Sequence, residues 1–206
     1  MAVDRQGGKA SAPHSSKIAL LIIDMISDFE FDDGHLLFRN ALPAARKILR
    51  FKQRARAAHI PTIYVNDNFG QWRSDFRQLV HRCLNEPVRG TPIARLLAPE
   101  EEDYFVLKPA NSGFFSTPLR TLLQLIGVET IVLTGVASNQ CVLFTAADAY
   151  VRNYQLVVPR DCVAANYTKD NELALEYFKR VLKADVRSSS RIRLPRAPYP
   201  GRRRHT

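Results

Sequence analysis

The chain alternates short apolar runs with longer segments in which apolar residues recur at helical spacing. The first run, Ile18–Ile23, is continuously aliphatic and too short for a core helix, which is typical of a strand buried on both faces. A short last strand near residues 184–186 is compatible with the same pattern. Four further runs predict strands at Pro61–Val65, Tyr104–Leu107, Thr130–Thr134 and Gln155–Val158.

The segments between these runs have the periodicity of amphipathic helices. The best marked is Leu119–Ile126, where apolar residues recur three and four positions apart. Thr117 and Pro118 supply an N-cap followed by a proline, and Gly127 is a typical helix end. Weaker stripes lie within Ala44–Ala55, Leu143–Tyr150 and Ala174–Val181. Strands that alternate with helices predict an α/β fold with a parallel sheet covered on both faces.

Composition and charge favour one globular domain with a basic tail. The 206 residues, 46% of them hydrophobic, are enough for one substantial core. The formal net charge is +10, but seven arginines from Arg187 onward, with no acidic residue among them, supply most of it. We expect residues 17–187 to form the domain, residues 1–16 a flexible N-terminal tail and residues 188–206 a disordered, arginine-rich C-terminal tail. A nearly balanced domain makes a nucleic-acid partner unlikely.

Cysteine usage and hydropathy indicate a cytoplasmic protein. The three cysteines form no even-numbered disulfide framework, and no pair has the spacing of a metal site. Residues 1–17 lack the apolar centre of a signal peptide, and no run approaches the roughly 18 apolar residues of a membrane span. We therefore expect a reducing compartment and no membrane partner.

Polar residues that follow the predicted strands are the first candidates for function, because ligands of open parallel sheets bind beyond the carboxyl ends of the strands. Asp24 follows the first strand, Lys108 the third, and the segment Gly135–Cys141 the fourth. The sequence contains no glycine-rich dinucleotide or phosphate-binding motif, no serine-hydrolase elbow and no zinc-protease motif. Thiol chemistry is the reading that survives.

Cys141 opens a predicted helix, where unpaired N–H groups and the helix dipole favour a thiolate. A nearby Lys108 would lower the pKa of the thiol further, and Asp24 could accept and later donate its proton. Each residue alone has a plainer explanation: a buried small side chain for Cys141, a turn cap for Asp24 and a solvated cation for Lys108. Their common location at strand ends favours a catalytic role.

Four sequence blocks together resemble the isochorismatase-like cysteine hydrolases, which include nicotinamidases, N-carbamoylsarcosine and ureidoacrylate amidohydrolases, and isochorismatases. The resemblance covers about Lys17–Val186. The blocks occur in family order at Ala19–Met25, Leu107–Leu119, Val132–Val142 with Thr145–Ala149, and Val157–Ala165.

This resemblance implies a fold, a catalytic triad and a reaction. The fold is a three-layer, Rossmann-like α/β/α domain with a six-stranded, mainly parallel sheet, and the triad maps onto Asp24, Lys108 and Cys141. A cis peptide bond is implied between Val136 and Ala137, which aims the backbone N–H groups of Ala137 and Cys141 at a developing oxyanion. In the implied reaction, the thiolate attacks a carbonyl and water then hydrolyses the thioester.

The chain departs from the nicotinamidase pattern where those enzymes bind a metal. Nicotinamidases carry an Asp-x-His motif and a second histidine after the second strand, whereas residues 66–72 here contain no histidine. His81 has no partner ligand near it in the sequence. We therefore expect no catalytic metal and no cofactor, and we do not expect nicotinamide as the substrate.

Four residues near strand ends are candidates for the wall of a substrate pocket: Phe29, Asn68, Trp72 and Phe114. Aromatic walls suit a planar or apolar substrate. The same residues fit a core or a subunit interface equally well, and the resemblance implies a homo-oligomer.

Three functions remain open from the sequence. The intact Asp24, Lys108 and Cys141 set favours hydrolysis of a C–N bond in a small amide, carbamoyl or ureido compound. A vinyl-ether hydrolase of the isochorismatase kind is the enzymatic alternative. A non-catalytic protein that uses its arginine-rich tail on nucleic acid or anionic surfaces is the alternative from another class.

Overall fold

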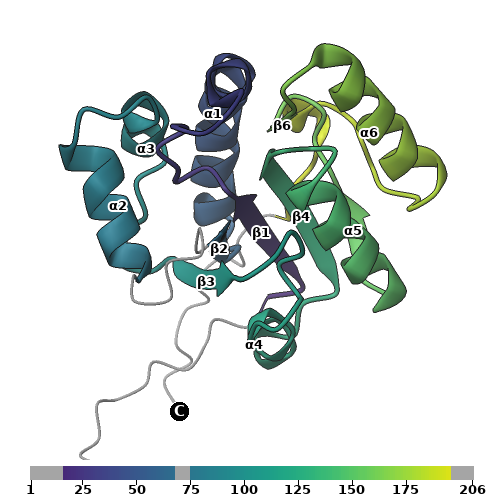
Figure 1. The fold of residues 1–206 in the computed structure, drawn as a ribbon. Helices are drawn as coiled ribbons and strands as arrows, with labels where there is room; N and C mark the ends of the chain where they lie inside the picture. Colours follow the sequence, from purple (N-terminus) through teal and green to yellow (C-terminus); the bar gives the residue numbers. More distant parts are fainter. Residues whose placement is uncertain (1–15, 68–74, 196–206) are drawn as a thin grey trace, which may run out of the picture.

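A parallel sheet of six strands forms the centre of the computed structural model, which describes residues 16–67 and 75–195 (Figure 1). The strand order is β3-β2-β1-β4-β5, and β6 pairs with the carboxyl end of β4. Every pairing between these strands is parallel. The strands are β1 (Ile18–Ile23), β2 (Thr62–Asp67), β3 (Tyr104–Lys108), β4 (Thr130–Val136), β5 (Gln155–Val157) and β6 (Val163–Ala164).

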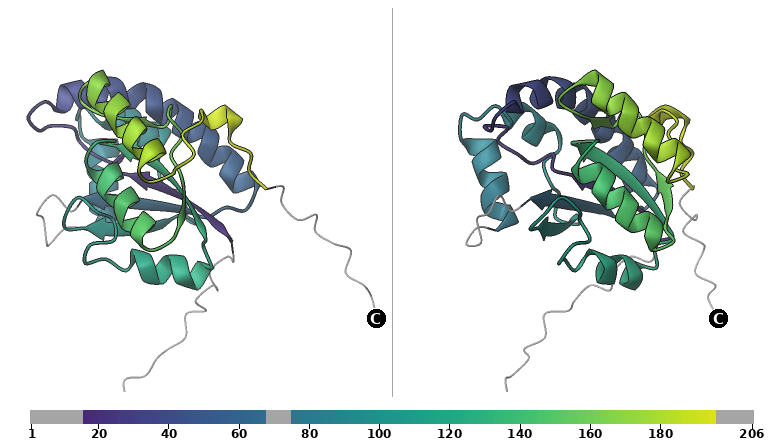
Figure 2. Two further views of the ribbon diagram at one scale, coloured as in Figure 1. Left: turned by 90° about the vertical axis from the view of Figure 1, so that its right-hand side faces the viewer. Right: turned by 45° about the vertical axis from the view of Figure 1, so that its right-hand side comes forward.

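Helices cover both faces of the sheet and make it the middle of three layers (Figure 2). Alternate residues of β1 face opposite ways, so Leu20 and Ile22 belong to one core while Leu21 and Ile23 belong to the other. The first core packs against α1 (Gly34–Ala57), α2 (Phe76–Asn85) and α3 (Thr91–Leu96). The second packs against α4 (Leu119–Ile126), α5 (Cys141–Val151) and α6 (Thr168–Arg180). This architecture confirms the predicted three-layer α/β fold.

Helix α4 shows how local sequence signals set the element boundaries. It begins at Leu119, whose N–H donates to the Thr117 hydroxyl at 3.2 Å, so Pro118 takes the N-cap position one residue later than predicted. It ends where Gly127 adopts a left-handed conformation with φ of 86°. Burial of Leu119, Leu123 and Ile126 against the sheet then fixes the orientation of the helix.

Some elements differ from the sequence prediction. Helix α1 begins ten residues before the predicted stripe, at Gly34, and continues through Pro43. The short last strand expected near residues 184–186 is reduced to one bridge between Val157 and Asp185. Helices α2 and α3 and the two-residue strand β6 had no clear periodic signal, since each is short.

The C-terminal boundary of the domain lies further along the chain than residue 187, so the expectation of disorder from residue 188 is wrong for residues 188–195. A 3₁₀ turn, η1 (Ser189–Arg191), is held by Asp161, whose carboxylate accepts from the Ser189 N–H at 2.6 Å and from the Ser189 hydroxyl at 2.8 Å. Arg54 donates to the Ile192 carbonyl at 2.6 Å, and the Ile192 side chain is buried. The remaining tail residues, 196–206 and 1–15, lie outside the described part of the chain.

The described helices were also compared with the requirements of a membrane span. Not one of them is both long enough and apolar enough to cross a bilayer.

Candidate active site

Three adjacent strands end in charged side chains at one edge of the sheet. Strand β2 lies between β1 and β3, and its last residue, Asp67, is paired in register with Lys108 at the end of β3. Asp24 follows β1 directly, and its N–H donates to the Val65 carbonyl of β2 at 2.9 Å. Its φ of 50° is left-handed, a conformation that aspartate tolerates better than most residues. Strand register therefore brings these three side chains together.

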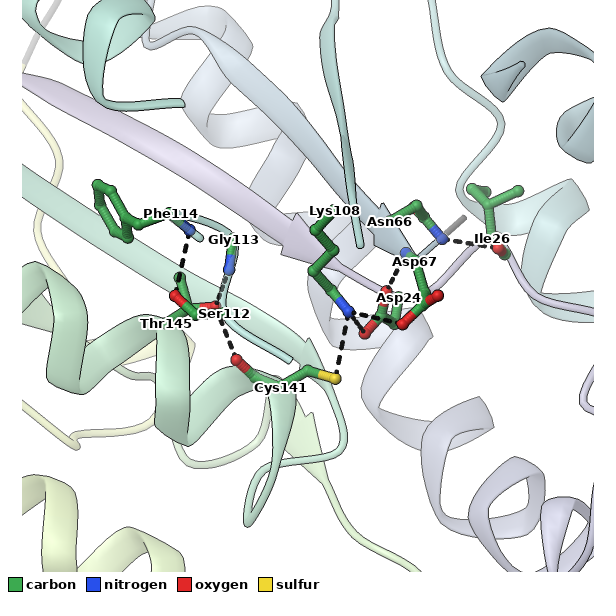
Figure 3. Close-up of polar contacts among 10 residues, drawn as sticks. All are labelled: Asp24, Ile26, Asn66, Asp67, Lys108, Ser112, Gly113, Phe114, Cys141 and Thr145. Atoms are coloured by element: carbon green, nitrogen blue, oxygen red, sulfur yellow. Dashed lines mark hydrogen bonds and ion pairs between the residues drawn. The ribbon is translucent and has the colours of Figure 1, made fainter. Parts of the chain in front are cut away.

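Lys108 is the centre of this cluster, and its side chain is completely buried (Figure 3). Its Nζ lies 2.9 Å from Asp24 Oδ2 and 3.3 Å from Asp67 Oδ2. The same nitrogen lies 3.3 Å from Cys141 Sγ. One ammonium thus contacts two carboxylates and the thiol.

Cys141 is the first residue of α5 and is held from two sides. Its carbonyl accepts from the Thr145 hydroxyl at 2.7 Å, and the Thr145 oxygen in turn accepts from the Gly113 N–H at 2.9 Å (Figure 3). The preceding loop is tied to β6, because the Ser138 N–H donates to the Ala164 carbonyl at 2.7 Å. These contacts fix the position of the sulfur relative to Lys108.

The peptide bond between Val136 and Ala137 is cis, as the family resemblance implies. The Ala137 carbonyl accepts from the N–H groups of Gln140 and Val142 at 3.0 and 3.2 Å, which closes the loop into the first turn of α5. Within residues 16–67 and 75–195, the N–H groups of Ala137 and Cys141 have no hydrogen-bond partner. Two backbone donors are therefore available beside the sulfur.

Burial dominates the electrostatics of the cluster. It raises the pKa of Asp24 above the usual carboxyl value, although the charge of Lys108 opposes this effect. Burial alone would lower the pKa of Lys108, but the charges of Asp24 and Cys141 outweigh it and raise that pKa. Lys108 is consequently an ammonium at neutral pH.

The thiol differs from the sequence expectation, which favoured a thiolate. Burial and the charge of Asp24 raise the pKa of Cys141 to about 12, and Lys108 offsets only part of this shift. The sequence argument counted the helix terminus and the lysine but not the loss of solvent. The thiol therefore keeps its proton until a base removes it, and the neighbouring Asp24 is the base at hand.

A cavity of about 500 Å³ opens above the sulfur. Asp24, Asp67, Ala137 and Cys141 line its floor. Its mouth is formed by the loop between β1 and α1 and by the beginning of α6: Phe31, Asp32, Asp33, Tyr167 and Asp170. The volume is that of a site for a small molecule.

The four residues predicted for the pocket wall have different outcomes. Phe29 lines the cavity, although its side chain is fully buried. The prediction for Phe114 is wrong, because its ring lies in the second core, where it stacks on Tyr154 at a centroid distance of 6.1 Å. Phe114 follows β3 in the sequence, but the chain turns there toward α4. Asn68 and Trp72 lie outside the described residues.

Sequence reasoning missed Asp67 and Asn66, the last two residues of β2. The side-chain amide of Asn66 donates to the Ile26 carbonyl at 2.7 Å and so holds the loop that follows Asp24 (Figure 3). The Asp67 N–H donates to Asp24 Oδ1 at 2.7 Å. The rule that polar residues at strand ends are functional applies to both, but the search there was for histidine ligands.

The donors near the cavity do not form a metal site among the described residues. In that part of the chain, no group of three or more His, Cys, Asp or Glu side chains is arranged to hold a metal ion. The nearest candidate side chains, Asp24 and Asp67, already contact the ammonium of Lys108.

Comparison with known proteins gives consistent matches over most of the chain. The family model of the Isochorismatase domain matches residues 18–189. An uncharacterized isochorismatase family protein from Bacillus subtilis, YaaI, is 44% identical over 174 residues, 84% of this chain and 95% of that protein. Maleamate amidohydrolase from Pseudomonas putida is 32% identical over 165 residues, 77% of this chain and 78% of that enzyme. The crystal structure of N-carbamoylsarcosine amidase from Thermoplasma acidophilum has a TM-score of 0.67 and 30% identity, covering 86% of this chain and 99% of that one.

Proposed function

Because the chain belongs to the isochorismatase-like hydrolase family, we propose that it hydrolyses a C–N bond of a small amide, carbamoyl or ureido compound through a thioester on Cys141. The observation that carries this proposal is the contact of one buried ammonium, Lys108, with both Asp24 and Cys141 at the floor of a cavity. Two of the relatives, maleamate amidohydrolase and N-carbamoylsarcosine amidase, are named for C–N bond hydrolysis.

The first half of the reaction forms the thioester. Asp24 takes the proton of the Cys141 thiol, and Lys108 stabilises the thiolate as it forms. The sulfur attacks the carbonyl carbon, and the resulting oxyanion accepts hydrogen bonds from the N–H groups of Ala137 and Cys141. The C–N bond then breaks, and the leaving nitrogen takes the proton from Asp24.

The second half restores the enzyme. Asp24, now a carboxylate, takes a proton from water, and the hydroxide attacks the thioester carbonyl. The same two N–H groups stabilise the second oxyanion. The carbon–sulfur bond breaks, the acid leaves, and the Asp24 proton returns to the sulfur.

Asp67 has a positioning role in this proposal. Its carboxylate is a second anionic partner that keeps Lys108 charged, and its N–H orients Asp24. The buried lysine therefore remains a cation while the proton moves between Asp24 and the sulfur.

Ammonia release from a panel of primary amides, carbamoyl and ureido compounds tests the proposal, together with mass spectrometry of the acid-quenched protein. We expect turnover and an acyl adduct on Cys141 in the native protein and neither in Cys141→Ala. The control is Cys83→Ala, which removes a core thiol that lies away from the cavity and should retain turnover. Turnover by Cys141→Ala, or an acyl adduct on Cys83 or Cys162, would overturn the mechanism.

A further inference from the structure

The cavity above Cys141 has an acidic, aromatic mouth, and we infer that its substrate is an amide or carbamoyl compound that also carries an organic cation, an alkylammonium or guanidinium group. This inference rests on the proposed function and specifies its substrate class. Its experiments are chosen so that one of them does not depend on turnover.

The charge of the wall is the first observation. The residues that line the cavity include five aspartates and, in the described part of the chain, no lysine, arginine or histidine. The floor carboxylates, Asp24 and Asp67, share the ammonium of Lys108. The three at the mouth, Asp32, Asp33 and Asp170, have no ion pair with any described residue. The wall is therefore negative although the whole chain is strongly basic.

Two of these carboxylates are stabilised as ions by their place in the fold. Asp33 is the N-cap residue of α1, and Asp170 lies in the first turn of α6. Carboxylates at these positions face the positive end of a helix dipole. Both therefore remain charged at neutral pH and repel an anionic ligand.

Exposed aromatic rings beside the carboxylates are the second observation. Phe31 is 44% exposed and Tyr167 is 53% exposed, and both line the cavity. Exposed rings next to acidic groups suit an organic cation, which is attracted by the π face and by the carboxylate charge together. An inorganic cation or a purely apolar ligand would use only one of the two features.

The mouth is held together as one unit. The side-chain amide of Asn40 donates to the carbonyls of Ala165 and Asn166, each at 2.9 Å, and the Asn166 amide donates to the Asp33 carbonyl at 3.3 Å. These contacts join the loop before α1 to the beginning of α6. The two acidic segments thus stand on the same opening, above the carbonyl that Cys141 would attack.

A labelling experiment measures the charge preference without any turnover. The probes are three methanethiosulfonates that modify Cys141 and differ in charge: a trimethylammonium-ethyl, a methyl and a sulfonatoethyl reagent. After division by each reagent's rate with a free thiol, we expect the cationic reagent to modify Cys141 at least about tenfold faster than the anionic one. The Asp32→Asn, Asp170→Asn double variant should reduce this ratio severalfold. The matched control is Glu172→Gln, an equal charge change on the exposed side of α6.

A turnover experiment measures the same preference in the reaction. Three amides with equal methylene chains are compared: 4-aminobutanamide, pentanamide and glutaramate. We expect the highest kcat/KM for the cationic 4-aminobutanamide and the lowest for glutaramate. The advantage should come mainly through KM, fall as salt is added, and shrink in the double variant but not in Glu172→Gln.

The outcomes separate the two proposals. Faster labelling by the anionic reagent, or a ratio unchanged in the double variant, overturns the inference about charge whatever the turnover. Preferred hydrolysis of glutaramate or pentanamide, with an acyl adduct on Cys141, also overturns it while the proposed function stands. Absence of any Cys141-dependent turnover counts against the proposed function, and the labelling ratio then decides the cationic character of the cavity.

Discussion

At the scale of single residues, proton transfer in the site depends on how far burial shifts each group. Asp24 and Cys141 are both shifted toward their neutral forms, while Lys108 remains charged between them. A proton shared by an aspartate and a thiol is exchanged more easily when the carboxyl pKa is raised toward that of its partner. The buried lysine supplies the charge that makes either anion tolerable.

The pH dependence of hydrolysis should show the raised pKa of Asp24. Only ionised Asp24 accepts the thiol proton, so activity is lost as the pH falls through that pKa. We expect the acidic limb of kcat/KM to lie above about 4, the ordinary range of aspartate. Asp24→Asn keeps an acceptor for the Asp67 N–H but removes the base, and should lower kcat by about 10²–10⁴-fold. A limb at or below the ordinary aspartate range would contradict this assignment.

At the scale of elements, the contact between β1 and β4 is the closest constraint on the site. Gly135 is paired with Ile23, has a φ of 109°, and a Cβ there would lie 2.0 Å from the Ile23 carbonyl oxygen. Asp24 is the next residue after Ile23, and Val136 begins the cis peptide. The absence of one side chain therefore allows two catalytic segments to approach each other.

Gly135→Ala is expected to lower the free energy of unfolding by about 3 kcal/mol or more, because the added Cβ overlaps backbone that has no room to move. The folded fraction should also lose hydrolysis, since Asp24 is displaced. Gly127→Ala is the matched control: its φ is also positive, but a Cβ there meets nothing within 4 Å. It should cost only about 1–2 kcal/mol and keep full activity. Urea unfolding and kcat measure both, and equal losses would refute the role of the close approach.

Periodicity found the long elements and missed the short ones. Strand β1 and helix α4 were predictable because their apolar residues repeat over several positions and their ends carry clear signals. Strand β6 has two residues, and α3 has six, so neither contains a full period to detect. The same limit applies to Asp67, whose function follows from the strand order and not from any local motif.

At the scale of the whole molecule, the domain is closed by its C-terminal segment. Ile192 lies in the first core, and Arg54 of α1 donates to the carbonyls of Ser189 and Ile192. Composition alone predicted disorder from residue 188, because serine and arginine dominate there. A single buried isoleucine and the long-range contacts of Asp161 are invisible to a compositional argument.

Ile192→Ala should therefore destabilise the protein by about 2–4 kcal/mol, the usual cost of emptying a buried isoleucine site. Arg193→Ala, in the same segment but with an exposed side chain, should change stability by less than about 0.5 kcal/mol. Urea unfolding of both variants measures the difference. Equal stabilities would mean that the segment is detached from α1 in solution.

The strand order has a consequence for how the enzyme is made. Strand β1 is synthesised first but lies between β2 and β4, and the loop before Cys141 is fixed by β6, near residue 164. Pairings between such distant parts of the chain form late in folding. A partly synthesised or partly folded chain therefore holds its thiol away from both the lysine and the carboxylate. The nucleophile is activated only once the sheet is complete, so the ribosome releases no reactive intermediate.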